Sequence, residues 1–204
     1  RLTPVAPLTF GRPLDEHPAR RVGLIGWRQK SQGQIGATLE MLRRRLEGGA
    51  ALLIDQPARC FNERAVGIAD RFAALWERER HRPADAFLGS ASLAFAAVLL
   101  FDQYGRNLFR EDARAFASDD LARAVARAMV ARGLDREIAA APRIFVYMPF
   151  MHSEEMADQL WSLALFEALG DENSLDYARE HQAMIARFGR FPHRNAALGR
   201  PDRP

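Results

Sequence analysis

Apolar side chains recur at helical spacing along most of this sequence, and residues that stop helices separate the successive stretches. Leu121, Val125 and Met129, for example, follow one another at four-residue intervals before Gly133. An apolar stripe of this period forms the buried face of an amphipathic helix, whereas a half-buried strand requires strict alternation. The pattern therefore predicts an all-α chain.

The same pattern extends along the chain from Ile35. We expect helices over residues 35–47, 62–79, 91–101, 119–132, 143–150, 154–169 and 175–188, and a short helical turn starting at Pro192. The expected N-caps are Asn62, Ser90, Ser118 or Asp119, Ser153 and Ser174, because their side-chain oxygens can accept a free backbone N–H. Residues 51–54 fit a short strand or a helical turn.

Short links between these helices favour antiparallel neighbours. We therefore expect one domain over residues 35–204, built as an antiparallel bundle of helical hairpins. Residues 1–34 contain four prolines and four glycines without sustained periodicity, which predicts an irregular N-terminal segment. No repeat of fixed period is present in the sequence.

Composition narrows the classes of function. The net charge is only +3, with acidic residues interleaved among arginines, so a nucleic-acid partner is not favoured. Cys60 is the only cysteine, which excludes intrachain disulfides and cysteine-rich metal sites. The longest apolar run, Leu93 to Phe101, is too short to span a bilayer. We expect a cytoplasmic protein without a membrane partner; the oligomeric state stays open.

Basic and aromatic residues alternate near the C-terminus. Within nine positions stand Arg187, Arg190, His193, Arg194 and Asn195, interspersed with phenylalanines and a proline. Guanidinium groups in such a setting bind a carboxylate or phosphate, or form one buried ion pair. We expect four of them to be ligand-binding candidates, namely Arg187, Arg190, Arg194 and Asn195. His193 is a candidate acid–base group.

A second polar group follows the apolar run. It consists of Asp102, Gln103, Arg106 and Asn107. A carboxylate at the C-terminal end of a helix is destabilised by the helix dipole, so Asp102 requires a cationic partner. The candidate partners are Arg106, Arg187, Arg190 and Arg194. Of these, we expect an arginine of the C-terminal segment to form the pair. The pair would either lock helix packing or hold an arginine ready for a substrate anion.

The third polar group is His152-Ser153-Glu154-Glu155. Ser153 and the two glutamates suit the start of a helix. His152 stands just outside it, and Glu155 could orient it as a general acid or base near neutral pH. His181 completes a set with His152 and His193, but the spacing lacks a close histidine pair, so we expect no metal site. No phosphate-binding or dinucleotide-binding loop indicates a cofactor.

Three motifs together resemble one bacterial family, the one catalogued as domain of unknown function 924. They are LLFDQYGRNLFR at 99–110 with ARAFASD at 113–119, FVYMPFMHSEEMADQ at 145–159, and YAREHQAMIARFGRFPHRNAALGR at 177–200. The resemblance covers residues 61–200 and implies a fold related to tetratricopeptide-type helical hairpins. It implies no established activity. Tyr104-Gly105 and Met151 depart from the usual family pattern.

Three functions are compatible with these groups. The first is a binding protein whose pocket, lined by arginine and histidine, takes an anionic small molecule or an acidic peptide. The second is an enzyme that uses His152 or His193 as general acid or base. The third is a structural interaction module in which the charged residues form internal salt bridges. We expect the polar residues of the three groups to converge on one cleft.

Overall fold

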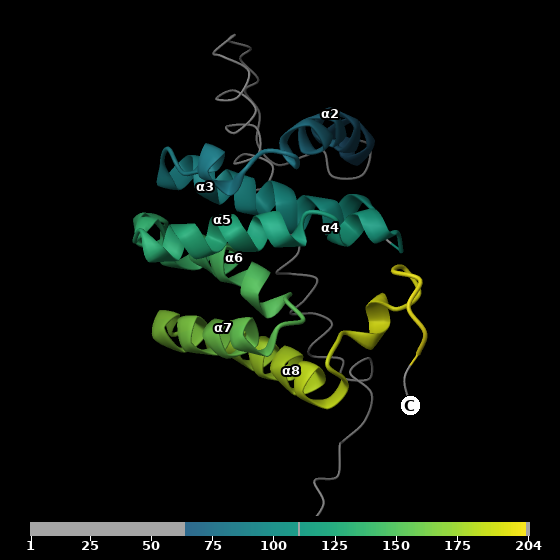
Figure 1. The fold of residues 1–204 in the computed structure, drawn as a ribbon. Coiled ribbons are helices and arrows are strands. Elements are labelled where there is room, and N and C mark those ends of the chain that lie inside the picture. The colour runs from purple at the N-terminus through teal and green to yellow at the C-terminus, as the bar shows by residue number, and fades with distance from the viewer. Residues whose placement is uncertain (1–63, 110, 203–204) are drawn as a thin grey trace, which may run out of the picture. The chain divides into compact units, whose positions relative to one another are not determined.

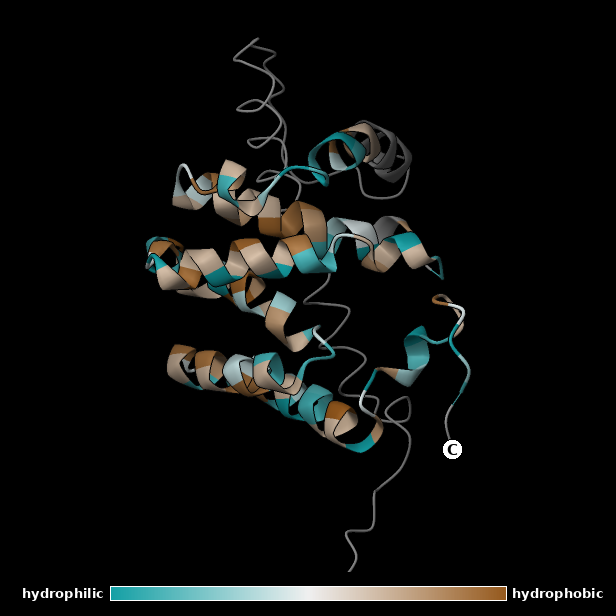
Figure 2. Cartoon of the chain, viewed as in Figure 1, coloured by the Kyte–Doolittle hydropathy of each residue, from teal (hydrophilic) through white to brown (hydrophobic). Residues whose placement is uncertain are grey.

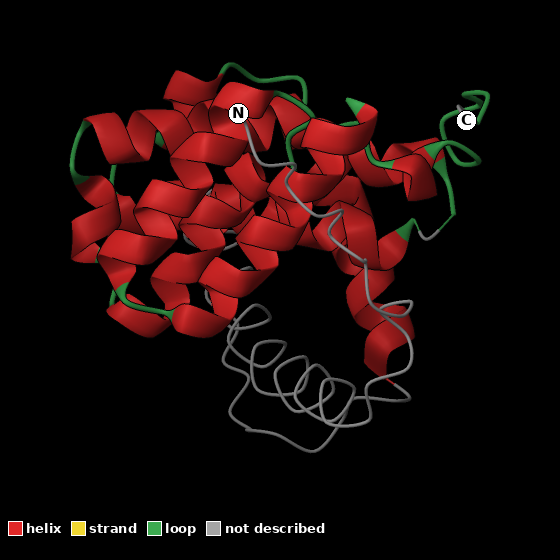
Figure 3. Cartoon of the chain, turned by 90° about the horizontal axis from the view of Figure 1, so that it is seen from below, coloured by secondary structure: helices red, strands yellow, loops and turns green. Residues whose placement is uncertain are grey.

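A computed structural model describes residues 64–109 and 111–202, and every regular element in these ranges is helical (Figures 1 and 3). The α-helices are α2 (Arg64–Glu79), α3 (Ala91–Val98), α4 (Gly105–Leu108), α5 (Asp119–Ala131), α6 (Ala140–Met151), α7 (Met156–Leu169) and α8 (Glu172–Phe188). The 3₁₀ turns are η2 (Ala84–Phe87), η4 (Ala113–Phe116), η5 (Leu134–Glu137) and η6 (Pro192–Arg194). A π-helical stretch, η3 (Leu99–Tyr104), continues α3. The predicted all-α fold is confirmed.

All of these elements belong to one compact unit. Several predictions lie outside the described residues: the irregular segment 1–34, the helix at 35–47, residues 51–54, the Asn62 cap and Cys60. The domain boundary at residues 34 and 35 therefore stays a prediction.

The continuous helix formed by α3 and η3 is the buried centre of the fold. Every residue from Ala94 to Asp102 is buried. The stretch is apolar on all sides of the helix (Figure 2), so only a helix covered on several faces can accommodate it. Both α5 and α6 pack against α3, and both also contact η3. Its position brings Asp102, the polar residue that ends the apolar run, into the interior.

Two of the expected N-caps are wrong. Helix α7 begins after Glu155, because the Ser153 hydroxyl donates to Asp158 at 2.8 Å and accepts the Glu155 N–H at 3.1 Å in the loop before it. Helix α8 begins after Asp171, whose carboxylate accepts the Ser174 N–H at 2.7 Å. At α8 a carboxylate takes the role that the serine suggested, whereas Glu155 precedes α7 without a side-chain capping bond.

Two other predicted helix starts agree with the structure, whereas α6 begins at Ala140, three residues before its predicted start. Ser90 caps α3 by accepting the Leu93 N–H at 3.2 Å. Ser118 precedes α5, but its hydroxyl makes no capping bond. It accepts from Trp76 Nε1 at 2.9 Å and donates to the Phe101 carbonyl at 2.6 Å. Ser118 therefore ties α2 to η3 at the start of α5.

Helices α7 and α8 pack along each other and are joined by a tight turn at Gly170. Helix α8 ends at Gly189, where φ is 65°, a conformation that favours glycine because it has no Cβ. The chain then turns back into η6. Arg200 holds this C-terminal segment through two hydrogen bonds to Glu154, at 2.7 and 2.9 Å.

Candidate functional site

Asp102 is the centre of a buried polar cluster where η3 meets the end of α6. His152 Nδ1 lies 2.7 Å from Asp102 Oδ1, and Gln103 Nε2 donates to Oδ2 at 2.6 Å. The guanidinium of Arg106 lies 3.4 Å from Oδ1, and the Asp102 side chain is only 1% exposed. Asp102 thus has one cation and two further partners.

The predicted partner of Asp102 was wrong. No arginine among residues 187–194 forms an ion pair with it. The cation is Arg106, which lies four residues further along the same helical run and therefore on the same face. The C-terminal segment contributes its arginine to a different carboxylate, that of Asp119.

Electrostatics favour a charged Asp102 beside a neutral His152. Burial opposes ionisation of Asp102, but the charges of His152 and Arg106 and the hydrogen bonds from His152 and Gln103 lower its pKa overall. Burial lowers the pKa of His152 to about 4, assisted by Arg106 and opposed by Asp102. At neutral pH the imidazole therefore donates Nδ1–H to the carboxylate, and its Nε2 carries a lone pair.

A second carboxylate joins two arginines beside this pair. Asp119 Oδ2 lies 2.7 Å from Arg106 and 3.5 Å from Arg194. Burial raises the pKa of Asp119 to about 6, with Asp102 acting in the same direction and the arginines against it. Both guanidiniums stack on the ring of Phe116, at 5.4 and 4.8 Å from its centroid.

Arg194 links this cluster to His152. Its Nη2 donates to the His152 carbonyl at 2.8 Å, and its side chain is 7% exposed. Burial lowers the pKa of Arg194 to about 10, and the charge of Arg106 adds to the effect. Arg194 is therefore an internal structural cation, committed to Asp119 and to the backbone of α6.

Residues 190–195 present two different faces because η6 is a 3₁₀ turn, in which residues three apart align. Phe191 and Arg194 face the interior. The Phe191 ring is fully buried and lies 5.4 Å from the His181 ring. Pro192 and Asn195 line a pocket instead, together with Arg190.

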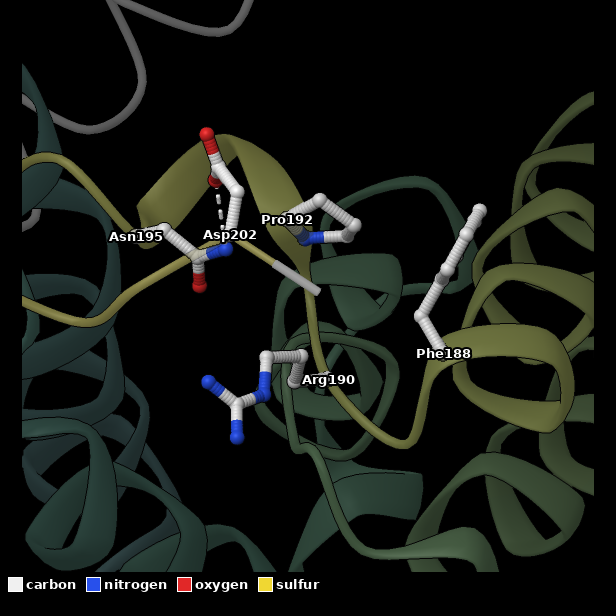
Figure 4. Close-up of a pocket in the computed structure, with 5 residues that line it drawn as sticks. All are labelled: Phe188, Arg190, Pro192, Asn195 and Asp202. Carbon is white, nitrogen blue, oxygen red and sulfur yellow. Dashed lines mark hydrogen bonds between the residues drawn. The ribbon is translucent and has the colours of Figure 1, made fainter. Parts of the chain in front are cut away.

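The pocket has a volume of about 170 Å³ and is completed by Phe188 and Asp202 (Figure 4). Asn195 Nδ2 donates to Asp202 Oδ1 at 3.0 Å, and Asn195 Oδ1 is buried without a partner among the described residues. The guanidinium of Arg190 makes no hydrogen bond or ion pair within residues 64–109 and 111–202. An unpaired cation and an unpaired acceptor therefore face one small cavity.

The predicted site residues fall into three sets. The cluster around Asp102 brings together Asp102, Gln103, Arg106, His152 and Arg194. The pocket takes Arg190 and Asn195, whereas His193 is exposed beside them, with its ring 5.5 Å from that of Phe191. The remaining candidates are Glu155, which is exposed and precedes α7, Arg187, which stacks on Phe188 at the surface, and Asn107, whose side chain lies outside the described part.

Sequence reasoning missed three contributors. The sequence indicates only a helix cap for Asp119. In the structure its side chain, in the first turn of α5, pairs with Arg106 and Arg194. Phe116 carried no signal beyond being aromatic, and Asp202 lies in a stretch with no pattern at all. The arginines themselves were the available signal for Asp119, because buried guanidiniums require carboxylates.

Within residues 64–109 and 111–202, no three histidine, cysteine or acidic side chains are grouped closely enough to hold a metal ion. None of the described helices combines the length and apolarity needed to cross a membrane.

Comparison with known proteins places this geometry in a family. A family model described as a bacterial protein of unknown function (DUF924) matches residues 55–204. A solved protein of unknown function from Agrobacterium tumefaciens is similar at 34% identity, with a TM-score of 0.67 over 84% of this chain and 93% of that one. A search of curated proteins found no match. Because the family model covers most of the sequence, this chain belongs to the bacterial DUF924 family.

Proposed function

We propose that this protein binds a small anionic molecule in the pocket lined by Arg190 and Asn195. The observation that carries the proposal is the unpaired guanidinium of Arg190 at the wall of a cavity. A partly buried cation without a counter-ion is costly, and a bound carboxylate or phosphate removes that cost.

The other arginines of this region support the assignment by contrast. Arg106, Arg194 and Arg200 are all bound to carboxylates within the protein. Those residues fit the structural-module hypothesis, whereas Arg190 does not. A cavity of about 170 Å³ also favours a small molecule over an acidic peptide, because drug-sized ligands occupy pockets of roughly 300–1,000 Å³.

Thermal denaturation with added phosphate or acetate tests this proposal. A ligand that binds only the folded state stabilises it by about 2.7 kcal/mol at a concentration 100-fold above its Kd. We expect at least one anion to raise the Tm of the wild type, and Arg190→Gln to abolish that rise. The matched control is Arg179→Gln, because Arg179 is an exposed arginine of α8 outside the pocket. Equal responses in both variants would overturn the proposal.

A second candidate function, general acid–base catalysis, is favoured by the contact between Asp102 and His152. A carboxylate that accepts Nδ1–H fixes the imidazole as a neutral base with Nε2 available. Nε2 of His152 makes no hydrogen bond among the described residues. Hydrolysis of model esters, amides and phosphate esters provides the test: His152→Asn should lose any activity that the wild type and Arg179→Gln share. Unchanged activity in His152→Asn would exclude this residue as the catalytic base.

A further inference from the structure

The pocket carries two opposite charges that do not neutralise each other. Arg190 and Asp202 line the same cavity, yet they form no ion pair with one another. We propose that the ligand of this pocket is a zwitterionic α-amino acid with an apolar side chain. This inference rests on the proposed function and specifies the class of the bound anion.

The carboxylate of such a ligand fits Arg190. The guanidinium has a planar fork of N–H donors that matches both oxygens of a carboxylate. In Figure 4 the Arg190 side chain extends into the space beside Asn195. With no internal partner among the described residues, its donors are available without breaking an existing bond.

The ammonium group of such a ligand fits the part of the pocket that Asn195 and Asp202 line. Asn195 is only 3% exposed, and its Oδ1 lacks a hydrogen-bond donor. The bond from Asn195 Nδ2 to Asp202 Oδ1 fixes the orientation of the amide, so Oδ1 is the atom that remains. A buried acceptor without a hydrogen-bond donor destabilises the folded protein. A ligand N–H shared between Asn195 and the second oxygen of Asp202 satisfies the acceptor and balances the carboxylate.

The remaining walls are apolar. Phe188 and Pro192 complete the lining, and they suit an aliphatic or aromatic side chain. A phosphate or a dicarboxylate fits less well, because its second negative charge would approach Asp202 without compensation. The charge pattern thus selects a zwitterion over a purely anionic ligand.

Isothermal titration calorimetry with three related probes tests this selection. The probes are L-leucine, 4-methylpentanoate, which lacks the amine, and L-leucinamide, which lacks the carboxylate. We expect L-leucine to bind at least tenfold more tightly than either analogue. We expect Arg190→Gln and Asp202→Asn each to weaken L-leucine binding at least tenfold, because each removes one of the two opposed charges.

Asp202→Asn is a conservative change, since an asparagine oxygen can still accept the bond from Asn195. That variant should leave the affinity for 4-methylpentanoate unchanged, which separates charge recognition from loss of structure. Asp176→Asn, at an exposed carboxylate of α8, is the matched control and should bind L-leucine like the wild type.

The outcomes separate this inference from the proposed function. If phosphate or 4-methylpentanoate binds through Arg190 as tightly as L-leucine, the zwitterion inference fails and anion binding stands. If L-leucine binds equally well to Asp202→Asn, the inference also fails. If none of the probes, phosphate included, binds the wild type, both proposals fail.

Discussion

The contact between Asp102 and His152 couples two side chains that are fifty positions apart in the sequence. Burial alone would leave both groups neutral, but Arg106 and the hydrogen-bond donors keep the carboxylate charged. Burial and the charge of Arg106 oppose protonation of the imidazole and outweigh the attraction of Asp102. The result is a neutral histidine whose tautomer is set by its carboxylate.

This arrangement predicts an unusual titration for one histidine. The His152 ring should titrate with a midpoint near pH 4 in the folded protein, because burial lowers its pKa to about 4. Nuclear magnetic resonance of the labelled histidine rings measures the titration midpoint. The same sample in denaturant gives the midpoint of an unperturbed histidine, about 6.5. Asp102→Asn should lower the midpoint further, since the only opposing charge disappears. A folded-state midpoint near 6.5 would contradict the assignment.

Loss of Asp102 should also destabilise the fold. Asp102→Ala leaves Gln103, His152 and Arg106 without their shared acceptor, and breaking a buried pair costs about 3–5 kcal/mol. We expect a value near the lower limit, about 3 kcal/mol, because Arg106 keeps Asp119 as a partner. Urea denaturation measures the difference. The control Asp176→Ala removes an exposed i,i+3 pair and should cost about 0.5 kcal/mol or less.

At the scale of elements, the π-helical stretch η3 positions the buried polar cluster around Asp102. A π-helical turn is wider than an α-helical one, and such turns are frequent at functional sites. Here it lies between the apolar α3 and the polar α4 and carries Asp102 and Gln103. The hydroxyl of Ser118 supports this turn from outside by donating to the carbonyl of Phe101.

The support from Ser118 can be measured. Ser118→Ala removes the donor to the Phe101 carbonyl and the acceptor of Trp76 Nε1, and each unsatisfied buried group costs about 1–3 kcal/mol. We expect a loss of at least about 2 kcal/mol in the free energy of unfolding. Ser162→Ala is the matched control, because among the described residues that buried hydroxyl bonds only to the Gln159 carbonyl of its own helix. Equal losses in both variants would show that Ser118 has no bridging role.

Helix positions were predictable from the sequence because periodicity and glycine stops are local signals. The start of α3 at Ser90 and the end of α5 before Gly133 agree with them. The caps of α7 and α8 were not predictable in the same way, since serines and carboxylates compete within a few residues for the same backbone N–H groups.

The site was predictable only in part, for a related reason. The charged residue types beside apolar stretches predicted a buried polar cluster. The structure does bring four of the candidates into contact: Asp102, Arg106, His152 and Arg194. The Asp102–Arg106 pair follows the i,i+4 spacing of one helical run. The Arg194–Asp119 pair depends on packing between distant segments, and no local pattern encodes it. The pocket is formed by one face of the short turn η6 and by Asp202. Neither shows a periodic pattern in the sequence.

At the scale of the whole described unit, the C-terminal segment is fastened mainly through Glu154. Its carboxylate binds Arg200 through both oxygens and also accepts the Phe191 N–H at 2.9 Å. The hydrogen bonds from Arg200 and Phe191 lower the pKa of Glu154, although burial opposes them. All lining residues of the pocket except Phe188 lie within the segment held in this way.

A double-mutant cycle on Glu154→Gln and Arg200→Gln measures that fastening. We expect a coupling energy of about 1 kcal/mol, at the upper end for partly exposed pairs, because the contact is bidentate. Limited proteolysis should cut both single variants after Gly189 faster than it cuts the wild type. The pair Asp176–Arg179 offers a comparison cycle without bidentate geometry. Coupling no larger than in that cycle would contradict a fastening role.

Folding also redistributes protons within the cluster. Burial raises the pKa of Asp119 from 3.8 to about 6 and lowers that of His152 from 6.5 to about 4. Near pH 5, the unfolded chain therefore carries an imidazolium and a carboxylate, whereas the folded chain carries both groups uncharged. As pH falls through this window, Asp119 adds stability and His152 removes a similar amount. For these two groups, folding moves one proton from the imidazolium of His152 to the carboxylate of Asp119, and the surrounding buffer neither supplies nor receives it.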